Sequence, residues 1–357
     1  MENLPAVSIA IPTYNEAEYI EAIIKNFLQT KYPNLVEILV ADGGSSDGTS
    51  EIVSNISFVD SRVKLLHNPR KIQSAGLNLA LEKSSGDVFL RADAHCDYAP
   101  DYVEKCVAAL QKSHALNVGG AQRFVARESF QSAIALAARS WLGSGGAKYR
   151  DPNYSGYADT VYLGCFERQA LMELDDSVPL NVFDTSQITN QDAELNQKLL
   201  DKNPQAIYIS SDIKVWYYPR KTWKSLWIQY FKYGRGRYLT ITKHPERSQL
   251  RGRLPFLFVS TMLVLLGFDL FFSPVDLYIK ELCLFGFASA MLESLRVNIS
   301  LGSKFIAEIW RGTSDRVPSF ISRWLGCGIV IFTMPLAHFS GYGYQVFKNR
   351  ILRKQGW

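Results

Sequence analysis

The sequence lacks the features of a secreted or disulfide-bonded protein. Its N-terminus, MENLPAVSIAIP, leads directly into a strand-like pattern, without the basic flank and apolar helix of a secretory signal. The five cysteines are scattered and show no C-x-x-C spacing, which argues against a disulfide framework and against a zinc site. There is no internal repeat and no low-complexity tail. We therefore expect free thiols and a working region in the cytoplasm.

Charged residues are scarce and unevenly placed. They make up 20% of the 357 residues, against 47% apolar residues, which is typical of a globular chain with a large core. Although the net charge is only +5, many basic residues gather between Arg220 and Arg253, where the single acid is Glu246. Such a basic run suits phosphate, nucleic acid or an anionic membrane surface.

Three apolar runs near the C-terminus have the composition of membrane helices. Residues 254–272 contain one charge, Asp269, in 19 residues, which is enough to cross a bilayer core of about 30 Å. The runs 275–295 and 325–347 are weaker candidates. The first of these contains a lysine and a glutamate, and the second is interrupted by Pro335 and several glycines. Buried core helices are the alternative for all three.

The basic region 219–253 precedes these runs and is also rich in aromatic residues, such as Trp223 and Tyr233. Basic and aromatic side chains together can read RNA. Directly before an apolar run they favour a helix at the level of the lipid headgroups, so we expect a membrane and no nucleic acid as partner. The region before the first run, the linker 296–324 and the tail are all basic. All three would face the cytoplasm, which three complete spans cannot satisfy, so the number and orientation of spans stay open.

The first part of the chain alternates strand and helix patterns. This alternation predicts an α/β fold with a mainly parallel, Rossmann-like sheet that is covered on both faces. Ligands bind such sheets at the carboxyl ends of the strands. After about residue 115 the alternation weakens, and residues 140–160 predict a mobile loop. The expected strands are 7–14, 36–43, 63–67, 87–93 and 206–219, and a further helix is expected at 189–200.

Several polar residues follow the predicted strands directly. In VADGGSSDGT, Asp42 ends a strand, and a carboxylate there can accept hydrogen bonds from a base or a ribose. An ordinary turn is the alternative. Tyr14 and Glu16 of IPTYNE lie beside the same crevice, although Glu16 can also complement a helix dipole. Lys71 lies where a third loop reaches the crevice and could face a pyrophosphate, or it could be a solvated charge.

An Asp-x-His pair ends the strand at 87–93. Alternate residues of a strand end can point to one side, so Asp93 and His95 could hold a divalent ion together with a diphosphate. Imidazole tolerates Mn²⁺ better than Mg²⁺. For His95, a hydrogen-bonding role in the loop is the alternative. Further along, Asp192 lies near a helix start, where a carboxylate stays ionised and can act as a general base.

Taken in order, VSIAIPTYNE, VADGGSSDGT, LRADAH and NQDAEL resemble the family 2 glycosyltransferases, inverting enzymes of GT-A fold that use nucleotide-sugar donors. The segment QYFKYGRGR looks like a variant of that family's Q-x-x-R-W motif. The likeness covers roughly residues 6–240. It is greatest to the membrane-bound sugar transferases of exopolysaccharide assembly, including the succinoglycan type, in which Asp-Ala-His replaces Asp-x-Asp.

The resemblance implies a role for each candidate residue. Asp192 would deprotonate the acceptor hydroxyl, and Asp93 would contact the ribose and, with His95, a Mn²⁺ or Mg²⁺ ion. Glu16 and Asp42 would contact uridine. The implied nucleotide-binding residues are Pro12, Tyr14, Glu16, Asp42, Lys71 and Asp93. The residues implied near the diphosphate or the acceptor are Gln229, Lys232 and Tyr233.

Three features depart from the family pattern. His95 changes the ligand set of the metal ion. Gln191 stands where the family commonly has Glu before the base. Lys232 and Tyr233 replace Arg and Trp, which is less typical of processive polymer synthesis.

We therefore predict a GT-A domain at 1–218, a basic aromatic interfacial region at 219–253 and membrane helices within 254–357. The protein would transfer one sugar from a UDP-sugar to a lipid-linked (polyprenyl diphosphate) acceptor in cell-surface polysaccharide biosynthesis. Its catalytic domain would face the cytoplasm at the inner membrane. The alternatives are a nucleotidyltransferase of similar fold, an inactive nucleotide-binding membrane protein and a processive synthase.

Overall fold

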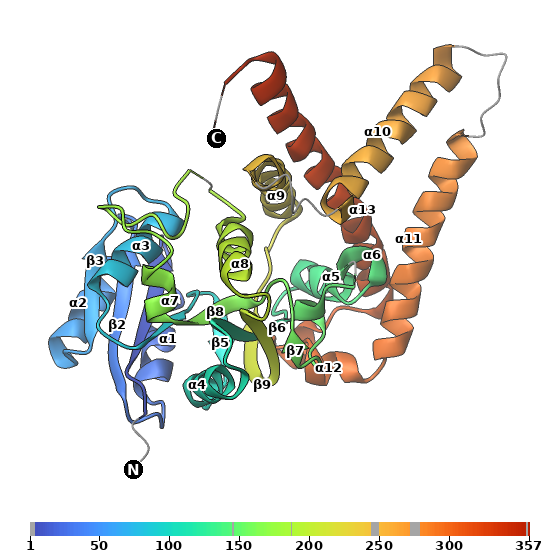
Figure 1. Ribbon diagram of the computed structural model, residues 1–357. Helices are drawn as coiled ribbons and strands as arrows, with labels where there is room; N and C mark the ends of the chain where they lie inside the picture. The colour runs from blue at the N-terminus through green and yellow to red at the C-terminus, as the bar shows by residue number, and fades with distance from the viewer. Residues whose placement is uncertain (1–3, 145, 187, 244–249, 272–278, 355) are drawn as a thin grey trace. The chain divides into compact units, whose positions relative to one another are not determined.

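The computed structural model describes residues 4–144, 146–186, 188–243, 250–271, 279–354 and 356–357. The chain forms two compact units (Figure 1). The first contains the chain up to Arg123 and Ala147–Tyr217, and the second contains Phe124–Gly146 and Tyr218–Trp357. The sequence predicts three consecutive segments. The difference lies in Phe124–Gly146, which interrupts the first unit in sequence and belongs to the second.

The first unit is built around one mixed β-sheet (Figure 1). Its strands are β1 (Val7–Thr13), β2 (Leu35–Asp42), β3 (Val63–His67), β4 (Val88–Arg91), β5 (Cys96–Tyr98), β6 (Asn117–Phe124), β7 (Gly156–Tyr157), β8 (Tyr162–Glu167) and β9 (Ile207–Tyr217). They lie in the order β3-β2-β1-β4-β8-β6-β9-β5, with β7 beside β9. The strands β3, β2, β1 and β4 are parallel, and β8 pairs antiparallel with β4. The predicted α/β fold with a parallel sheet is confirmed.

Helices of the first unit pack against this sheet, as the strand–helix alternation predicts. Helix α1 buries Ile20, Ile23 and Phe27 on one face, which is the apolar stripe of its sequence. Leu77 of α3 joins Phe89 of β4 in a buried apolar cluster. The helices are α1 (Ile20–Leu28), α2 (Thr49–Val59), α3 (Gln73–Lys83), α4 (Tyr102–Ser113), α7 (Arg168–Met172) and α8 (Gln191–Lys202), with a 3₁₀ turn at Lys148–Arg150.

Strand β6 has a sequence, NVGGAQRF, that does not read as a strand. Its glycines have low strand propensity, but Gly120 lies against the backbone of the neighbouring strand β9. A Cβ at Gly120 would stand 2.2 Å from the carbonyl oxygen of Ile213. The close approach of two backbones therefore requires glycine here, and the propensity of the sequence is overridden.

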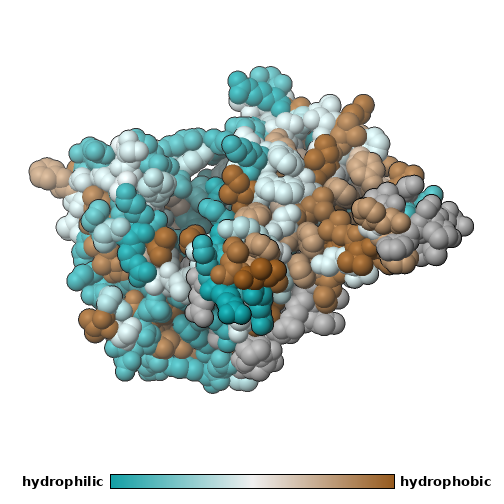
Figure 2. All heavy atoms as spheres, turned by 90° about the horizontal axis from the view of Figure 1, so that it is seen from above, coloured by the Kyte–Doolittle hydropathy of each residue, from teal (hydrophilic) through white to brown (hydrophobic). Residues whose placement is uncertain are grey.

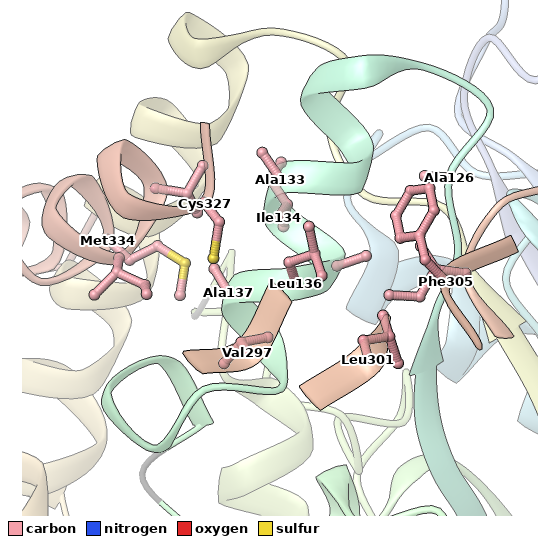
Figure 3. Close-up of a cluster of buried hydrophobic side chains, with 14 of the residues drawn as sticks. Ala126, Ala133, Ile134, Leu136, Ala137, Val297, Leu301, Phe305, Cys327 and Met334 are labelled. Carbon is pink, nitrogen blue, oxygen red and sulfur yellow. The ribbon is translucent and has the colours of Figure 1, made fainter. Parts of the chain in front are cut away.

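The second unit consists of helices around a separate apolar core. Figure 3 shows Leu136 of α5 packed among Val297 of α11, Phe305 of α12 and Cys327 of α13. Burying one large apolar side chain stabilises a fold by about 1.5–3 kcal/mol. The helices are α5 (Ser129–Ala138), α6 (Trp141–Ser144), α9 (Trp223–Lys243), α10 (Leu250–Phe271), α11 (Ile279–Leu301), α12 (Lys304–Glu308) and α13 (Phe320–Val346), with a 3₁₀ turn at Ser314–Arg316 and a π turn at Phe347–Ile351.

Two stretches of this unit, Glu281–Leu301 and Phe320–Ile351, are helices long and apolar enough to span a membrane. Only 22% and 39% of their most apolar windows are buried, which favours a lipid environment over the core of a soluble protein. Figure 2 shows hydrophobic residues gathered over the region of α10, α11 and α13. The exposed apolar side chains include Leu284, Phe285 and Leu292 on α11.

These helices differ in part from the predicted runs. The run 254–272 lies in α10, where Val259–Asp269 forms a shorter apolar stretch, and its last residue lies outside the described residues. The run 275–295 begins outside the described residues and continues in α11. The expected interruption of the third run is wrong, because α13 is one continuous helix with Pro335 inside it.

We predict that Glu37 makes the stability of the first unit depend on pH. This buried carboxylate of β2 accepts hydrogen bonds from the Ser8 hydroxyl at 2.7 Å and from the Ser85 amide at 2.6 Å, and it pairs with Lys64 at 2.7 Å. Burial alone would raise the pKa of Glu37, but these donors outweigh it and lower the pKa. The stabilisation is therefore present above the unfolded pKa of about 4.3 and is lost as the pH falls through the lower folded pKa.

Glu37→Gln leaves Lys64 without its charge partner. It also places a side-chain NH₂ group beside the Ser8, Ser85 and Lys64 donors, where it has no acceptor. We expect a loss of about 2 kcal/mol at neutral pH, measured by thermal or chemical unfolding of the detergent-solubilised protein. The difference from wild type should shrink below about pH 4. Glu51→Gln, at an exposed position of α2, is the control. A difference between wild type and Glu37→Gln that is independent of pH would contradict this account.

Candidate active site

The predicted motifs meet because parallel strands end at one edge of the sheet. In the register of the sheet, Thr13 of β1 lies beside Asp42 of β2, and Ala10 of β1 lies beside Arg91 of β4. The loops that follow these strands, with the sequences YNE, GGSSDG and ADAH, therefore open to the same side. Pro12, a predicted nucleotide-binding residue, lies in the same register opposite Ala41.

Asp42 organises the loop that follows its own strand. Its carboxylate accepts hydrogen bonds from the Gly44 and Ser45 amides, both at 3.0 Å, and from the hydroxyls of Ser45 and Ser50. Burial alone would raise the pKa of Asp42, but these four bonds outweigh it and lower the pKa. The side chain is only 3% exposed. The observed role of Asp42 is thus to shape the turn, and its contact with uridine stays a prediction.

Tyr14 and Lys71 flank this glycine turn. A Cβ on Gly43 would stand 3.4 Å from the Tyr14 ring, and one on Gly44 would stand 3.7 Å from the Lys71 ammonium. Tyr14 is 55% exposed, and Lys71 is also exposed. The turn is therefore lined by an aromatic ring and a positive charge, which are suited to a base and a phosphate.

Arg91 is the central charge of the site. It is the last residue of β4 and only 4% exposed, and its Nη1 donates a hydrogen bond to Asp192 Oδ1 from the first turn of α8. Its Nη2 lies 3.4 Å from Asp93 Oδ1. Burial alone would lower the pKa of Arg91, but the two carboxylates outweigh it and raise the pKa, so the guanidinium stays charged. The proposed base and the proposed metal ligand are thus held by one buried cation.

The backbone of Asp93 is also fixed. Its amide donates to the Tyr98 hydroxyl at 2.7 Å, and that hydroxyl donates to the Asp93 carbonyl at 3.0 Å. The side chain of Gln73 adds two contacts. Its Nε2 donates to Asp93 Oδ1 at 3.3 Å, and its Oε1 accepts from Gln191 Nε2 at 2.6 Å. Gln191, which departs from the family pattern, therefore links α8 to Asp93 through Gln73.

His95 lies between a carboxylate and an aromatic ring. Its Nδ1 is 3.4 Å from Glu16 Oε1, and its ring contacts the edge of Tyr217 with 5.5 Å between the ring centroids. Glu16 is held in turn, because its amide donates to Thr49 Oγ1 at 2.9 Å. Glu16 was predicted beside the nucleotide, and the contact that the structure shows is with His95.

The residues present fit a divalent cation with few protein ligands. Asp93 Oδ2 and His95 Nε2 make no hydrogen bond to the described residues, so both atoms are available. Within the described parts of the chain, no group of three or more His, Cys, Asp or Glu side chains is placed to hold a metal ion. The remaining ligands would come from a diphosphate or water, as is usual for Mg²⁺ and Mn²⁺ in nucleotide sites.

The predicted acceptor residues lie in the second unit. Gln229, Lys232 and Tyr233 share helix α9, where the Gln229 amide donates to the Tyr233 hydroxyl at 3.0 Å. Their placement at the diphosphate or the acceptor stays a prediction.

Sequence reasoning missed Arg91, Gln73 and Tyr98. For Arg91 a signal exists in the sequence, because a charge inside an apolar strand that is covered by helices must be paired. For Gln73 and Tyr98 no such signal exists, because their roles depend on how loops distant in sequence meet.

Comparisons with known proteins identify the family of the chain. The family model "Glycosyl transferase family 2" matches residues 8–172. The succinoglycan biosynthesis protein ExoA of Rhizobium meliloti (strain 1021) is 37% identical over 249 residues, which are 69% of this chain and 73% of that protein. A dolichyl N-acetyl-α-D-glucosaminyl phosphate 3-β-D-2,3-diacetamido-2,3-dideoxy-β-D-glucuronosyltransferase of Methanococcus voltae is 27% identical, over 74% of this chain and 83% of that protein.

A solved structure shares the fold. The mannosyltransferase PcManGT of Pyrobaculum calidifontis, in complex with GDP-mannose and Mn²⁺, superposes with a TM-score of 0.57 at 16% identity, covering 94% of this chain and 88% of that one. The chain belongs to glycosyltransferase family 2, and its first unit has the GT-A fold. The predicted enzyme class is confirmed, and the nucleotidyltransferase alternative is excluded.

We predict that Arg91→Met destabilises the protein by about 3 kcal/mol, because it leaves the mostly buried Asp93 beside Asp192 without a counter-charge. Arg91→Lys keeps the charge but cannot contact both acids through two separate nitrogens, so we expect a smaller loss of stability. Chemical unfolding of the detergent-solubilised protein measures both variants. Full stability of Arg91→Met would show that the guanidinium does not hold the two acids.

Proposed function

We propose that this glycosyltransferase moves one sugar from a UDP-sugar to a lipid-linked acceptor, with inversion at the anomeric carbon. We place it in the biosynthesis of cell-surface polysaccharide at the inner membrane, with the first unit in the cytoplasm. The observation that carries this proposal is the bridge formed by Arg91, which joins Asp192 to Asp93. The carboxylate that we propose as the base thereby lies beside the group that would hold the donor's diphosphate.

Asp192 has the geometry of a general base. Arg91 occupies Oδ1, and Oδ2 makes no hydrogen bond to the described residues, so one oxygen remains for an acceptor hydroxyl. The side chain is 45% exposed, which lets an acceptor reach it. Its position in the first turn of α8 favours the ionised carboxylate that a base requires.

In the transfer step, the acceptor oxygen forms a bond to the anomeric carbon of the donor sugar. The bond between that carbon and the diphosphate oxygen breaks, and UDP leaves with the electron pair. The proton of the acceptor hydroxyl passes to Asp192 Oδ2. Because attack and departure take place on opposite faces of the sugar, the configuration is inverted.

Asp93 and His95 would hold the divalent cation, which when bound stabilises negative charge on the leaving diphosphate. Lys71, above the glycine turn, can add a further positive charge to that phosphate. Tyr14 offers a ring on which uracil can stack.

The lipid-linked acceptor is supported by two observations. The name of the Methanococcus voltae relative describes transfer to a dolichyl-linked sugar phosphate, and the Rhizobium meliloti relative acts in succinoglycan biosynthesis. The exposed apolar helices α11 and α13 fit a membrane, where such acceptors reside. The basic aromatic helix α9 suits the headgroup level.

We predict that Asp192→Asn lowers the rate of transfer by roughly 10²–10⁴-fold, because the amide cannot take the proton. Asparagine still accepts a hydrogen bond from Arg91, so the affinity for UDP should stay within about twofold. The assay measures UDP released from a panel of UDP-sugars and GDP-mannose with polyprenyl diphosphate-linked sugars as acceptors.

Asp201→Asn, at an exposed position of the same helix, is the matched control and should transfer at the wild-type rate. Loss of UDP binding in Asp192→Asn would contradict the assignment of Asp192 as the base. Turnover with GDP-mannose alone would replace the proposed donor, and products with many added sugars would favour a processive synthase.

We also predict that UDP binds tightly only in the presence of a divalent cation. Calorimetric titration of the detergent-solubilised protein with UDP, once with Mn²⁺ and once with EDTA, measures this dependence. Equal binding in both conditions would mean that Asp93 and His95 hold no metal ion. Absence of UDP binding in both would refute the nucleotide site around Asp42.

A further inference from the structure

We propose that Glu16 is a positioning residue that acts through His95, and this inference rests on the proposed function. The carboxylate of Glu16 fixes the imidazole with its proton on Nδ1, so that the Nε2 lone pair is presented to the cation beside Asp93. The resemblance to the family implies a uridine contact for Glu16, and the structure assigns it a different task.

The contact itself carries the first part of the argument. Glu16 Oε1 lies 3.4 Å from His95 Nδ1, and no hydrogen bond of either side chain to another described residue competes with this contact. An acceptor beside one ring nitrogen of a histidine favours the tautomer that carries its proton on that nitrogen. A carboxylate at Nδ1 therefore selects the form in which Nε2 is unprotonated and can bind a metal ion.

Both partners are held in place by their surroundings. The Glu16 amide donates to Thr49 Oγ1, and its carbonyl accepts from the amides of Tyr19 and Ile20, so the loop around it is rigid. The edge contact with Tyr217 restricts the His95 ring. A ring that is fixed from two sides keeps its free nitrogen in a constant direction.

Direct ligation by Glu16 is not what the geometry shows. Asp93, His95 and Glu16 do not form a three-residue metal cluster in the described chain. The acids around the site, Glu16, Asp93 and Asp192, are only partly balanced by Arg91 and by the exposed Lys71. The remaining negative charge favours the binding of a cation. Glu16 contributes to this binding through its contact with His95.

A double-mutant cycle separates this role from a nucleotide contact. Mn²⁺ affinity in the presence of UDP, measured from the electron paramagnetic resonance signal of free Mn²⁺, is compared for wild type, Glu16→Ala, His95→Asp and the double variant. We expect Glu16→Ala to weaken Mn²⁺ binding by about 10–100-fold when His95 is present. In the His95→Asp background, where no imidazole needs orienting, Glu16→Ala should change it by less than about threefold.

Two further variants sharpen the comparison. Glu16→Gln keeps an oxygen that can accept from Nδ1–H, so its loss should be smaller than that of Glu16→Ala. Glu21→Ala removes an exposed acid of α1 and should leave Mn²⁺ affinity unchanged. The weak UDP binding that remains in EDTA should have the same affinity in Glu16→Ala and in wild type.

The tautomer gives an independent readout that needs neither metal nor variant enzyme activity. In protein labelled with ¹⁵N-histidine, the His95 signals, identified by their loss in His95→Asp, should show the proton on Nδ1 in wild type. In Glu16→Ala this preference should disappear. A proton on Nε2 in the wild-type protein overturns the proposal.

The other outcomes are equally decisive. Equal losses of Mn²⁺ affinity in both backgrounds, or weaker UDP binding by Glu16→Ala in EDTA, would overturn the proposal in favour of a nucleotide contact. Wild-type protein that transfers sugar without binding Mn²⁺ refutes this inference and the metal site, and leaves the proposed sugar transfer standing. Wild-type protein that binds no UDP and transfers no sugar refutes the proposed function as well.

Discussion

A single buried guanidinium organises the edge of the sheet where the candidate active site lies. Arg91 stands at the end of β4, where water is excluded, and a charge in that position is stable only if acids accompany it. Asp93 comes from the same strand end, whereas Asp192 comes from a helix about a hundred residues later in the chain. The pairing therefore connects a helix that is distant in sequence to the strand end, and the position of Asp192 follows from the need of Arg91 for a counter-charge.

The same constraint explains the order of the surrounding contacts. Gln191 and Gln73 connect the start of α8 to Asp93, and Tyr98 fixes the backbone of Asp93. The two loops that carry Glu16 and His95 meet because β1 and β4 are neighbours in the sheet. Polar side chains from separate parts of the chain are thus arranged before any substrate arrives, which is the condition for electrostatic stabilisation of a transition state.

Much of the first unit follows from sequence. The parallel strands β1–β4 are marked by apolar runs, and the residues at their ends, such as Asp42 and Asp93, follow from the rule that ligands bind there. The position of β6 does not follow, because Gly120 fits the close approach of two backbones and has a low strand propensity. Nor does the pairing of Glu16 with His95, since the two are far apart in the chain and meet only once the sheet has formed.

The segment Phe124–Gly146 has a practical consequence for the whole chain. Its helix α5 contributes Ala133, Leu136 and Ala137 to the apolar core of the helical unit, although it precedes the last part of the sheet in sequence. Ending the chain after Tyr217 would therefore remove the helices that cover α5 and leave its apolar face in water. A chain without the helical unit would therefore also have to lose this segment. The first unit is thus connected to the helical unit in the middle of its chain as well as at its end.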